Sequence, residues 1–324
     1  MPVLLVNGMR VDNILLASIA SNNCFSADSF SVIVATSSSA SEDMIFWSSL
    51  TSAYIEIYSA DMQNAIITGM ADSVILDWFQ GTAKIEGRDL SSLLIDNSPQ
   101  QDFVNRTAAE MVTAIALKHS LIPVVSATQG NAGRFFGSDF TRLSLARFSR
   151  IRSEWDLVVQ LARECQFDAY VVGTSLYFQP MNSSTDPAVV VTPSDLASLK
   201  IHQSLWINSD QPVNVTSWNS QDMKSYGSDI SSTGTVSAYV FGGANLTALQ
   251  VTDDTSRYMQ ELLRLKVNLT AETVRFSSIN PRTTVYLDGF ASTVDGLYQI
   301  NNINQAYSST RGFKQTIGLS VVNS

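Results

Sequence analysis

The sequence predicts a mainly β protein with an α/β section between two β regions, which places it in the α+β class. Residues 283–324 alternate apolar and polar side chains in runs bounded by glycines, and residues 3–11 do the same around Asn7-Gly8. Between these regions, residues 107–118 and 153–165 carry apolar side chains at helical spacing. A period of two is typical of strands, and a period near 3.6 is typical of helices.

Composition and charge exclude some broad classes of function. The chain has 324 residues, enough for about two domains. Hydrophobic residues make up 45% of it, which is ample for a core, and charged residues only 15%, below the usual value of about 25%. The net charge is −9, and a surface of this sign repels phosphate backbones. We therefore expect no sequence-specific nucleic-acid binding.

The N-terminus and the cysteines show no sign of secretion, membrane insertion or metal binding. Residues 1–10 lack the basic segment and long apolar run of a signal peptide. No run in the sequence approaches the ~18 apolar residues of a membrane span, so no membrane insertion is expected. Cys24 and Cys165 fall in different predicted elements without metal-ligand spacing. We interpret both as buried, reduced thiols.

Residues 1–95 are predicted to be all β. Asn7-Gly8 suits the tight turn of a hairpin between two short apolar runs. The serine-rich stretch 37–41 predicts a loop. After the last strand, Gly87 and Asp89 are interpreted as turn and cap residues. The predicted strands are Val3–Val6, Met9–Val11, Phe30–Ala35, Tyr54–Tyr58, Ser73–Trp78 and Thr82–Glu86.

Residues 96–182 predict two helices followed by a hairpin. Thr107 and Glu110 have the spacing of a capping box, in which each side chain binds a free backbone N–H of the first turn. Ser153 and Asp156 open the second helix in a similar way. The apolar stripes are Ala108, Met111, Val112, Ile115 and Ala116, then Trp155, Val158, Leu161, Ala162 and Cys165. The hairpin strands are Asp168–Val172 and Leu176–Phe178 around a turn at 173–175.

Residues 183–324 return to β structure, with a loop and helix excursion at about 221–270. Glycine and serine at 227–243 predict a loop, and Asp253-Asp254 stand at the favourable dipole end of a helix. The expected elements are strands at Ser198–Ile207 and Pro212–Trp218, a helix at Thr255–Val267 and a strand that begins with Val274 and Phe276.

The C-terminal meander has strands at Thr284–Leu287, Leu297–Ile303 and Phe313–Val321. Asp295-Gly296 predicts a tight hairpin, because this pair accepts positive φ. Tyr298, Ile300 and Asn302 share one face of the middle strand in a regular alternation. We expect Tyr298 and Ile300 to lie in a core.

Three segments carry motifs more particular than their secondary-structure patterns. The helix and hairpin at 153–178 include Trp155, and the strand at 213–218 ends on Trp218. The meander carries Gly296, Tyr298, Ile300, Gly312 and Phe313, and Gly87 with Asp89 forms a shorter motif. In this order, the motifs resemble the phage late control protein D family. Its members are baseplate hub proteins of contractile tails, related to the front part of the VgrG proteins of type VI secretion.

The resemblance implies a fold and an assembly. It implies two tube-like antiparallel β-barrels, at residues 1–95 and 183–324, with the helix-hairpin α/β domain at 96–182 between them. It also implies a homotrimer whose six barrels form a pseudo-sixfold ring. Such a ring adapts a six-fold tail tube to a three-fold spike and lets DNA pass during genome ejection.

The resemblance also implies partners and a location. The partners would be the tail tube protein above, a spike protein below, and tape measure and baseplate wedge proteins. VgrG-like members continue into a spike, whereas this sequence stops after the last strand, so we expect a separate spike protein. The location would be the baseplate of the virion tail, assembled in the cytoplasm of a bacterial host.

Residues that commonly carry catalysis are few and scattered. His119 and His202 fall in different predicted elements, and a Ser-His-Asp triad would need one of them. The chain has no G-x-S-x-G, Walker A or H-E-x-x-H motif. We expect a structural protein without enzyme activity, cofactor or metal. Four acids lack the spacing of a calcium-binding loop, and we interpret them as solvated: Asp222, Asp229, Asp253 and Asp254.

Alternatives remain open. A hub of type VI secretion or of another contractile injection system would share the fold. A carbohydrate-binding or adhesin β-protein is a different class, and would bind sugar as a monomer. The carboxylate pair of a glycosidase leaves no local signature. A sugar platform would use exposed aromatics such as Trp47, Trp78, Trp206 and Trp218, although strand-spaced aromatics more often pack in a core.

Overall fold

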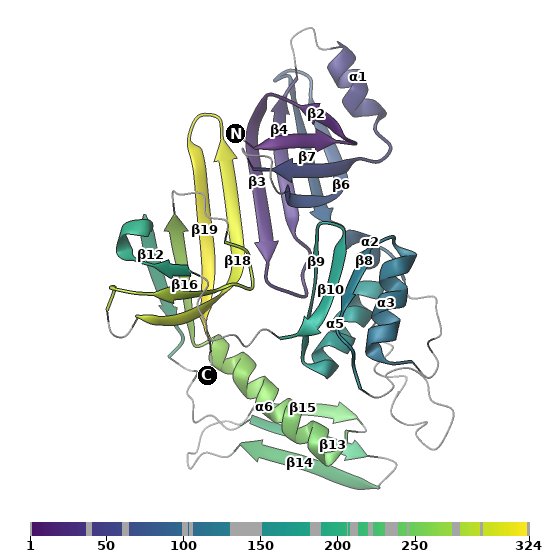
Figure 1. Ribbon diagram of the computed structural model, residues 1–324, viewed down its shortest axis with the longest axis vertical. Coiled ribbons are helices and arrows are strands. Elements are labelled where there is room, and N and C mark those ends of the chain that lie inside the picture. The colour runs from purple at the N-terminus through teal and green to yellow at the C-terminus, as the bar shows by residue number, and fades with distance from the viewer. Residues whose placement is uncertain are drawn as a thin grey trace.

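The computed structural model confirms the mainly β, α+β fold class. It describes residues 2–36, 41–59, 65–98, 103, 106–129, 151–181, 189–205, 207, 213–219, 223–230, 239–244, 246–273, 279–291 and 294–322. Figure 1 shows two β halves side by side, an α/β section beside them, and a small sheet with one helix at the far end.

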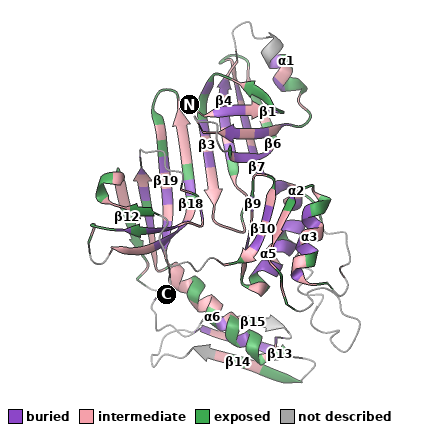
Figure 2. Cartoon of the chain, in the orientation of Figure 1, coloured by how far each residue is buried: buried purple, intermediate pink, exposed green. Residues whose placement is uncertain are grey.

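The N-terminal β half encloses its own hydrophobic core. The core includes Leu4, Val32, Ile55 and Ile85, all essentially inaccessible to solvent. In Figure 2, buried residues alternate with partly exposed ones along the strands of this half. The half consists of β1 (Val3–Val6), β2 (Met9–Val11), β3 (Ile14–Asn22), β4 (Ser29–Ala35), α1 (Ser41–Ser49), β5 (Tyr54–Tyr58), β6 (Ala65–Asp77) and β7 (Thr82–Asp89).

The C-terminal β half encloses a second core around Leu287, Tyr298, Ile300 and Leu319. Its strands are β11 (Val189–Val191), β12 (Ser198–Gln203), β16 (Val267–Thr273), β17 (Thr284–Leu287), β18 (Gly296–Ser308) and β19 (Gly312–Val321). The burial of Tyr298 and Ile300 in this core is as predicted.

One strand pairing joins the two β halves into a continuous sheet. Residues 302–308 of β18 pair antiparallel with residues 16–22 of β3. Among the described residues, 13 strands form one sheet, whose main path runs β12-β16-β19-β18-β3-β4-β7-β6-β5-β1-β2. The halves predicted as separate barrels therefore share backbone hydrogen bonds along a common seam (Figure 1).

The α/β section follows the first β half in sequence. Its helices are α2 (Ser92–Ile95), α3 (Ala108–Lys118) and α5 (Glu154–Cys165), and its sheet has the order β8-β10-β9 from Ile122–Val125, Ser175–Pro180 and Phe167–Val172. Both predicted capping boxes are present, at Thr107 with Glu110 and at Ser153 with Asp156. The hairpin turn is also confirmed, with Gly173 at φ +57°.

The excursion is a separate small layer rather than a loop with a late helix. The predicted loop at 227–243 was wrong, because β14 (Lys224–Ile230) and β15 (Tyr239–Ala244) flank β13 (Val213–Asn219) as strands, while residues 231–238 lie outside the described part. Helix α6 (Ala248–Arg264) begins earlier than predicted and contains Asp253 and Asp254. Its capping box, Thr247 with Gln250, is the start signal that the prediction missed.

Three predictions for the first 95 residues need correction. The region is not all β, since α1 follows the loop stretch, of which residues 37–40 are not described. Strand β3 was not predicted. Gly87 is not a turn residue but lies within β7, where an added Cβ would come 2.2 Å from the Met70 carbonyl oxygen and 2.5 Å from Phe30 Cζ. Glycine is therefore needed there for close packing.

The meander also departs from prediction at two points. Gly296 is the first residue of β18 and is not in a tight positive-φ turn. Asp295 instead accepts hydrogen bonds from the backbone of Phe290 (2.8 Å) and Ala291 (3.3 Å) in a longer loop. A bulge between Ile300 and Asn302 reverses the alternation, so that Asn302 is exposed and Ile303 is buried.

The tryptophans divide between core and surface. Trp47 is buried, as expected for a strand-spaced aromatic, but it lies in α1. Trp78 and Trp218 are 63% and 59% exposed, which contradicts their assignment to a core. Trp218 belongs to the small sheet and does not enter the second β half. Trp206, Asp222, Val274 and Phe276 lie outside the described residues.

The buried position of Ile300 leads to a stability prediction. Ile300→Asp would place a carboxylate without a partner in the second core, which costs several kcal/mol, on the order of 3–5, or forces protonation. We expect urea denaturation to show the C-terminal half unfolded or severely destabilised. The matched control is Ile75→Asp, because Ile75 is 53% exposed in β6. Equal stability of the two variants would contradict the assignment.

Candidate functional site

The connection between β3 and β4 is the point where the three main parts of the chain meet. Phe25, at its centre, adopts φ +65°, and its N–H donates to the Ala169 carbonyl (3.0 Å) in β9. The carbonyl of Phe25 accepts a hydrogen bond from Trp155 Nε1 (3.1 Å) in α5, and Arg163 lies over the Phe25 ring at 5.4 Å. The tip of a first-half hairpin is thus seated in the α/β section.

Arg282 brings the C-terminal half to the same connection. It follows the Asn280-Pro281 turn between β16 and β17, and its N–H donates to the Ile300 carbonyl (3.1 Å). Its Nη1 donates to the carbonyls of Asn22 (3.0 Å) and Asn23. Its guanidinium lies 3.9 Å from the centre of the Tyr170 ring in β9. Arg282 therefore links the C-terminal half to both the first half and the α/β section.

The geometry of Arg282 shows that its surroundings hold it in place. Its φ of +77° is unusual for a residue with a side chain, and such conformations cost on the order of 1–3 kcal/mol. Burial lowers its pKa, an effect that Tyr170 and Asp28 oppose. A guanidinium stays protonated under these conditions. The contacts with carbonyls and ring therefore offset both strain and desolvation.

Two carboxyl groups and a thiol line the same connection. Asp28 Oδ1 accepts a hydrogen bond from the Asn22 N–H (2.7 Å), and burial raises its pKa. Burial, with Asp168 alongside, raises the pKa of Cys24 to about 12, so the thiol stays neutral. Cys24 and Cys165 are free and half-buried, rather than fully buried as predicted.

Asp89 extends the cluster toward the first half. Its N–H donates to the Asp28 carbonyl (2.9 Å), and its Oδ1 accepts hydrogen bonds from the Ser91 N–H and hydroxyl. Burial, with Asp28 nearby, raises the pKa of Asp89 to about 7, although the Ser91 hydrogen bonds work against this rise. Asp89 thus holds the turn before α2, in agreement with its predicted role.

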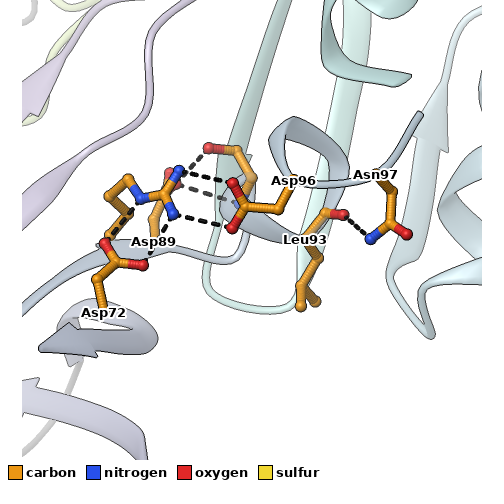
Figure 3. A network of polar contacts seen from close by, with 7 residues as sticks. Asp72, Asp89, Leu93, Asp96 and Asn97 are labelled. Atoms are coloured by element: carbon orange, nitrogen blue, oxygen red, sulfur yellow. Dashed lines mark hydrogen bonds and ion pairs between the residues drawn. The ribbon is translucent and has the colours of Figure 1, made fainter. Parts of the chain in front are cut away.

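An ion-pair network lies beside Asp89. Figure 3 shows Asp72 and Asp96 on either side of the Arg88 guanidinium. Arg88 Nε is 2.7 Å from Asp72 Oδ2, and its Nη2 is 2.9 Å from Asp96 Oδ2. The network ties β6 to the end of α2, although partly exposed pairs of this kind contribute little each.

A third polar cluster fixes the two long helices of the α/β section. Glu154 is buried at the start of α5 and accepts from Lys118 Nζ (2.6 Å) and contacts His119 Nε2 at the end of α3. A buried carboxylate with two partners is satisfied. Removal of the partners would leave an uncompensated charge in the interior, which strongly destabilises the fold. The predicted helix-end position of His119 is confirmed. His202 lies exposed on β12.

The structure brings together only some of the predicted motif residues. Asp89 and Trp155 both contact the β3–β4 connection. Tyr298 and Ile300 lie in the second core, and Gly312 with Phe313 begins β19 beyond a hairpin turn. Trp218 lies apart from all of these, in the small sheet.

Sequence reasoning missed Phe25, Asp28 and Arg282. The carbonyls that the Arg282 side chain binds are about 260 positions away in sequence, so no local pattern predicts them. Within the part of the chain that the structure describes, no group of three or more His, Cys, Asp or Glu could hold a metal ion, and no helix is long and apolar enough to cross a membrane. The geometry supports a rigid joint between the three parts of the chain. By this name we mean the β3–β4 connection together with Trp155 and Arg282, which hold it.

The joint leads to a prediction about Arg282. Arg282→Met would remove its hydrogen bonds to two carbonyls and its contact with Tyr170, which should lower the free energy of unfolding by roughly 2–4 kcal/mol. Thermal and urea unfolding measure this loss. Arg10→Met is the control, since Arg10 is exposed and pairs only with Asp12 in the described structure. A loss no larger than that of the control would rule out the joint.

The buried carboxyl of Asp89 leads to a prediction about pH. Its folded pKa of about 7 lies above the unfolded value of about 3.9. The folded state therefore binds the proton more tightly, and this group lowers stability as pH rises from about 4 to about 7. Asp89→Asn keeps an acceptor for Ser91 and should weaken this pH dependence, by an amount on the order of a few kcal/mol.

Urea denaturation of both proteins at pH 5 and pH 8 tests this expectation. Burial also raises the pKa of Asp28, so this group should leave a residual slope of the same sign. Asp12→Asn serves as an exposed control. An unchanged pH dependence in Asp89→Asn would contradict the prediction.

Comparison with known proteins defines the fold. No protein-family model and no curated protein matches the sequence. Among solved structures, the tail protein from Neisseria meningitidis MC58 has a TM-score of 0.75 at 12% identity, over 98% of this chain and 95% of that one. The 43 kDa tail protein of prophage MuSo2 from Shewanella oneidensis has a TM-score of 0.75 at 13% identity, over 99% and 98%.

A third similar structure comes from a secretion system. A component of the E. coli type VI secretion system, described as similar to the T4 bacteriophage tail proteins gp27 and gp5, has a TM-score of 0.61 at 11% identity. The match covers 99% of this chain and 77% of that one. The chain thus has a fold found in phage tail proteins and in type VI secretion components.

Proposed function

We propose that this protein is a structural baseplate hub of a contractile phage tail. Three copies would form a ring that adapts a six-fold tail tube to a three-fold spike and lets DNA pass. The full-length match to two tail proteins supports this proposal, together with the order of motifs similar to the late control protein D family. The role requires no catalysis and no cofactor.

The observation that carries the proposal is the division of one sheet into two β halves. Each half has its own core, and the β3–β18 pairing holds the halves side by side. Three such chains supply six comparable units around an axis, which a pseudo-sixfold ring needs. In the described pairing, the path ends at β2 and β12, and an edge strand presents unpaired N–H and carbonyl groups with which another chain can pair.

The proposal includes partners and a location. The neighbours would be the tail tube protein, a separate spike protein, and tape measure and wedge proteins. The ring would belong to the virion tail and would assemble in the host cytoplasm. Each chain carries a net charge of −9. DNA would therefore pass without tight binding, because the acidic groups of the protein repel the phosphates more than its lysines and arginines attract them.

A second candidate is a hub of type VI secretion or another injection system. The E. coli component favours it, because its match covers 99% of this chain. The two candidates differ in their neighbours and not in the fold. A carbohydrate-binding role gains little from the exposed tryptophans, since Trp78 lies in the turn after β6 of the large sheet, whereas Trp218 lies in the small sheet.

The ring can be tested directly. Light scattering on a sizing column should give about three times the 35.3 kDa mass of one chain, and electron micrographs should show rings. The same measurements should be repeated with the neighbouring tail proteins present, because their binding above and below the ring would stabilise it by mass action. A single copy per assembled tail would disprove the hub.

A further inference from the structure

The first β half reaches the α/β section at two neighbouring places. One is the β3–β4 connection, whose Phe25 packs against the core of the α/β section. The other is the step from β7 to α2, because Ile85 lies in the first core and Leu94 in the α/β core. The Asp89 N–H donates to the Asp28 carbonyl (2.9 Å) and thereby joins the two places. Any movement of one part against the other must bend the chain here.

The carboxyl group of Asp89 is enclosed at this point. Asp89 is only 5% exposed, and its Oδ1 accepts hydrogen bonds from the N–H and the hydroxyl of Ser91. Gly69 of β6 pairs with Asp89, and an added Cβ on Gly69 would come 2.9 Å from the Asp89 Cα. Packed backbone therefore surrounds the residue, and solvent contributes little to stabilise a charge on it.

The charged groups around Asp89 do not compensate a negative charge. The Asp28 carboxyl acts on Asp89 from the β3–β4 connection and repels such a charge. Arg88 is the neighbouring cation, but its guanidinium pairs with Asp72 on β6 and with Asp96 after α2 (Figure 3). Within the described part of the chain, Asp89 forms no ion pair with a lysine, arginine or histidine.

We propose that the α/β section is attached to the first half by a proton-controlled hinge, in which protonated Asp89 keeps the two neighbouring places together and ionised Asp89 releases them. The ionised carboxyl gains water and distance from Asp28 only when the hinge opens. A proton thus acts as a ligand that binds the closed hinge more tightly than the open one. Arg282 offsets the charge of Asp28 but is engaged with the carbonyls of Asn22 and Asn23. This hinge goes beyond the proposed hub function and does not depend on it.

The titration of Asp89 sets the pH range of the hinge. The pKa of Asp89 is about 7 in the closed structure, whereas an exposed aspartate has a pKa of about 3.9. Opening should therefore become more frequent as pH rises from about 4 to about 7, by about tenfold per pH unit in the middle of this range. Above it, the open and closed states bind no proton and the frequency of opening is constant. Between pH 5 and pH 7.5 the expected increase is on the order of a hundredfold.

Hydrogen exchange of the full chain, read by mass spectrometry with fragmentation to single residues, tests the hinge. Each rate is divided by the rate of the unfolded peptide at the same pH. From pH 5 to pH 7.5, the amides of Asp89 and Ser91 should lose protection by a factor on the order of a hundred. The amide of Ile85, within β7, should keep its protection, because it belongs to the first core.

Two variants assign the effect to Asp89. Asp89→Asn keeps an acceptor for Ser91 but has no proton to lose, so most of the change with pH should disappear. Asp28→Asn keeps an acceptor for Asn22 and removes the repelling charge, so opening should reach its constant level at a lower pH. Asp12→Asn, on an exposed residue, is the control and should behave as the unmodified protein does.

Three results would overturn the hinge. The first is equal protection of the Asp89 and Ser91 amides at both pH values. The second is a loss of protection at Ile85 by the same factor, because pH would then act on the whole fold. The third is a full pH dependence in Asp89→Asn. If Asp89→Asn does not fold, Asp28→Asn decides, and an unchanged pH dependence in that variant contradicts the hinge.

Discussion

The pairing of β3 with β18 is the constraint on which the rest of the structure depends. It joins residues 16–22 to residues 302–308, close to the two ends of the sequence. Without it, each β half would expose an edge of unpaired N–H and carbonyl groups beside its own core. Because long-range pairing of this kind closes a very large loop, it is expected to form late in folding. The α/β section and the small sheet lie between β3 and β18 in the sequence, so both must be accommodated when this pairing forms.

The joint around Arg282 fixes the orientation of the two β halves, which the β3–β18 pairing alone would not. A sheet can twist at any pair of strands, so hydrogen bonds between β3 and β18 alone would leave the halves free to flex. The β3–β4 connection is held by Trp155 from one side and by Arg282 from the other. These contacts come from segments that no strand of the large sheet contains. The relative position of the halves is thereby defined at one end, while the other end remains open for contact.

The parts of this fold that sequence could predict are those with local causes, such as the capping boxes at Thr107 and Ser153. Strand β3 escaped prediction because a register shift between Ile14 and Leu16 disrupts the alternation. The outer strands of the small sheet, β14 and β15, were missed because glycine is normally unfavourable inside strands, and the helix α6 that packs on the core of this sheet is what compensates for the glycines there. Residues of the joint had no local signal at all, because their partners are brought near only by the finished topology.

A pair of glutamines on neighbouring strands, Gln305 and Gln315, separates the parts of β18 that pack into the two cores. Along β18, Ile303 packs in the second core and Tyr307 packs against the first, with Gln305 between them. The cross-strand neighbour of Gln305 is Gln315, which is fully buried. Among the described residues, neither the amide nitrogen nor the amide oxygen of Gln315 has a hydrogen-bond partner, a cost of about 1–3 kcal/mol for each group. A slip of β18 by two residues would move Gln305 into one of the cores and displace an apolar residue from it. The buried amides thus lower stability but oppose the wrong register of β18 against its neighbours.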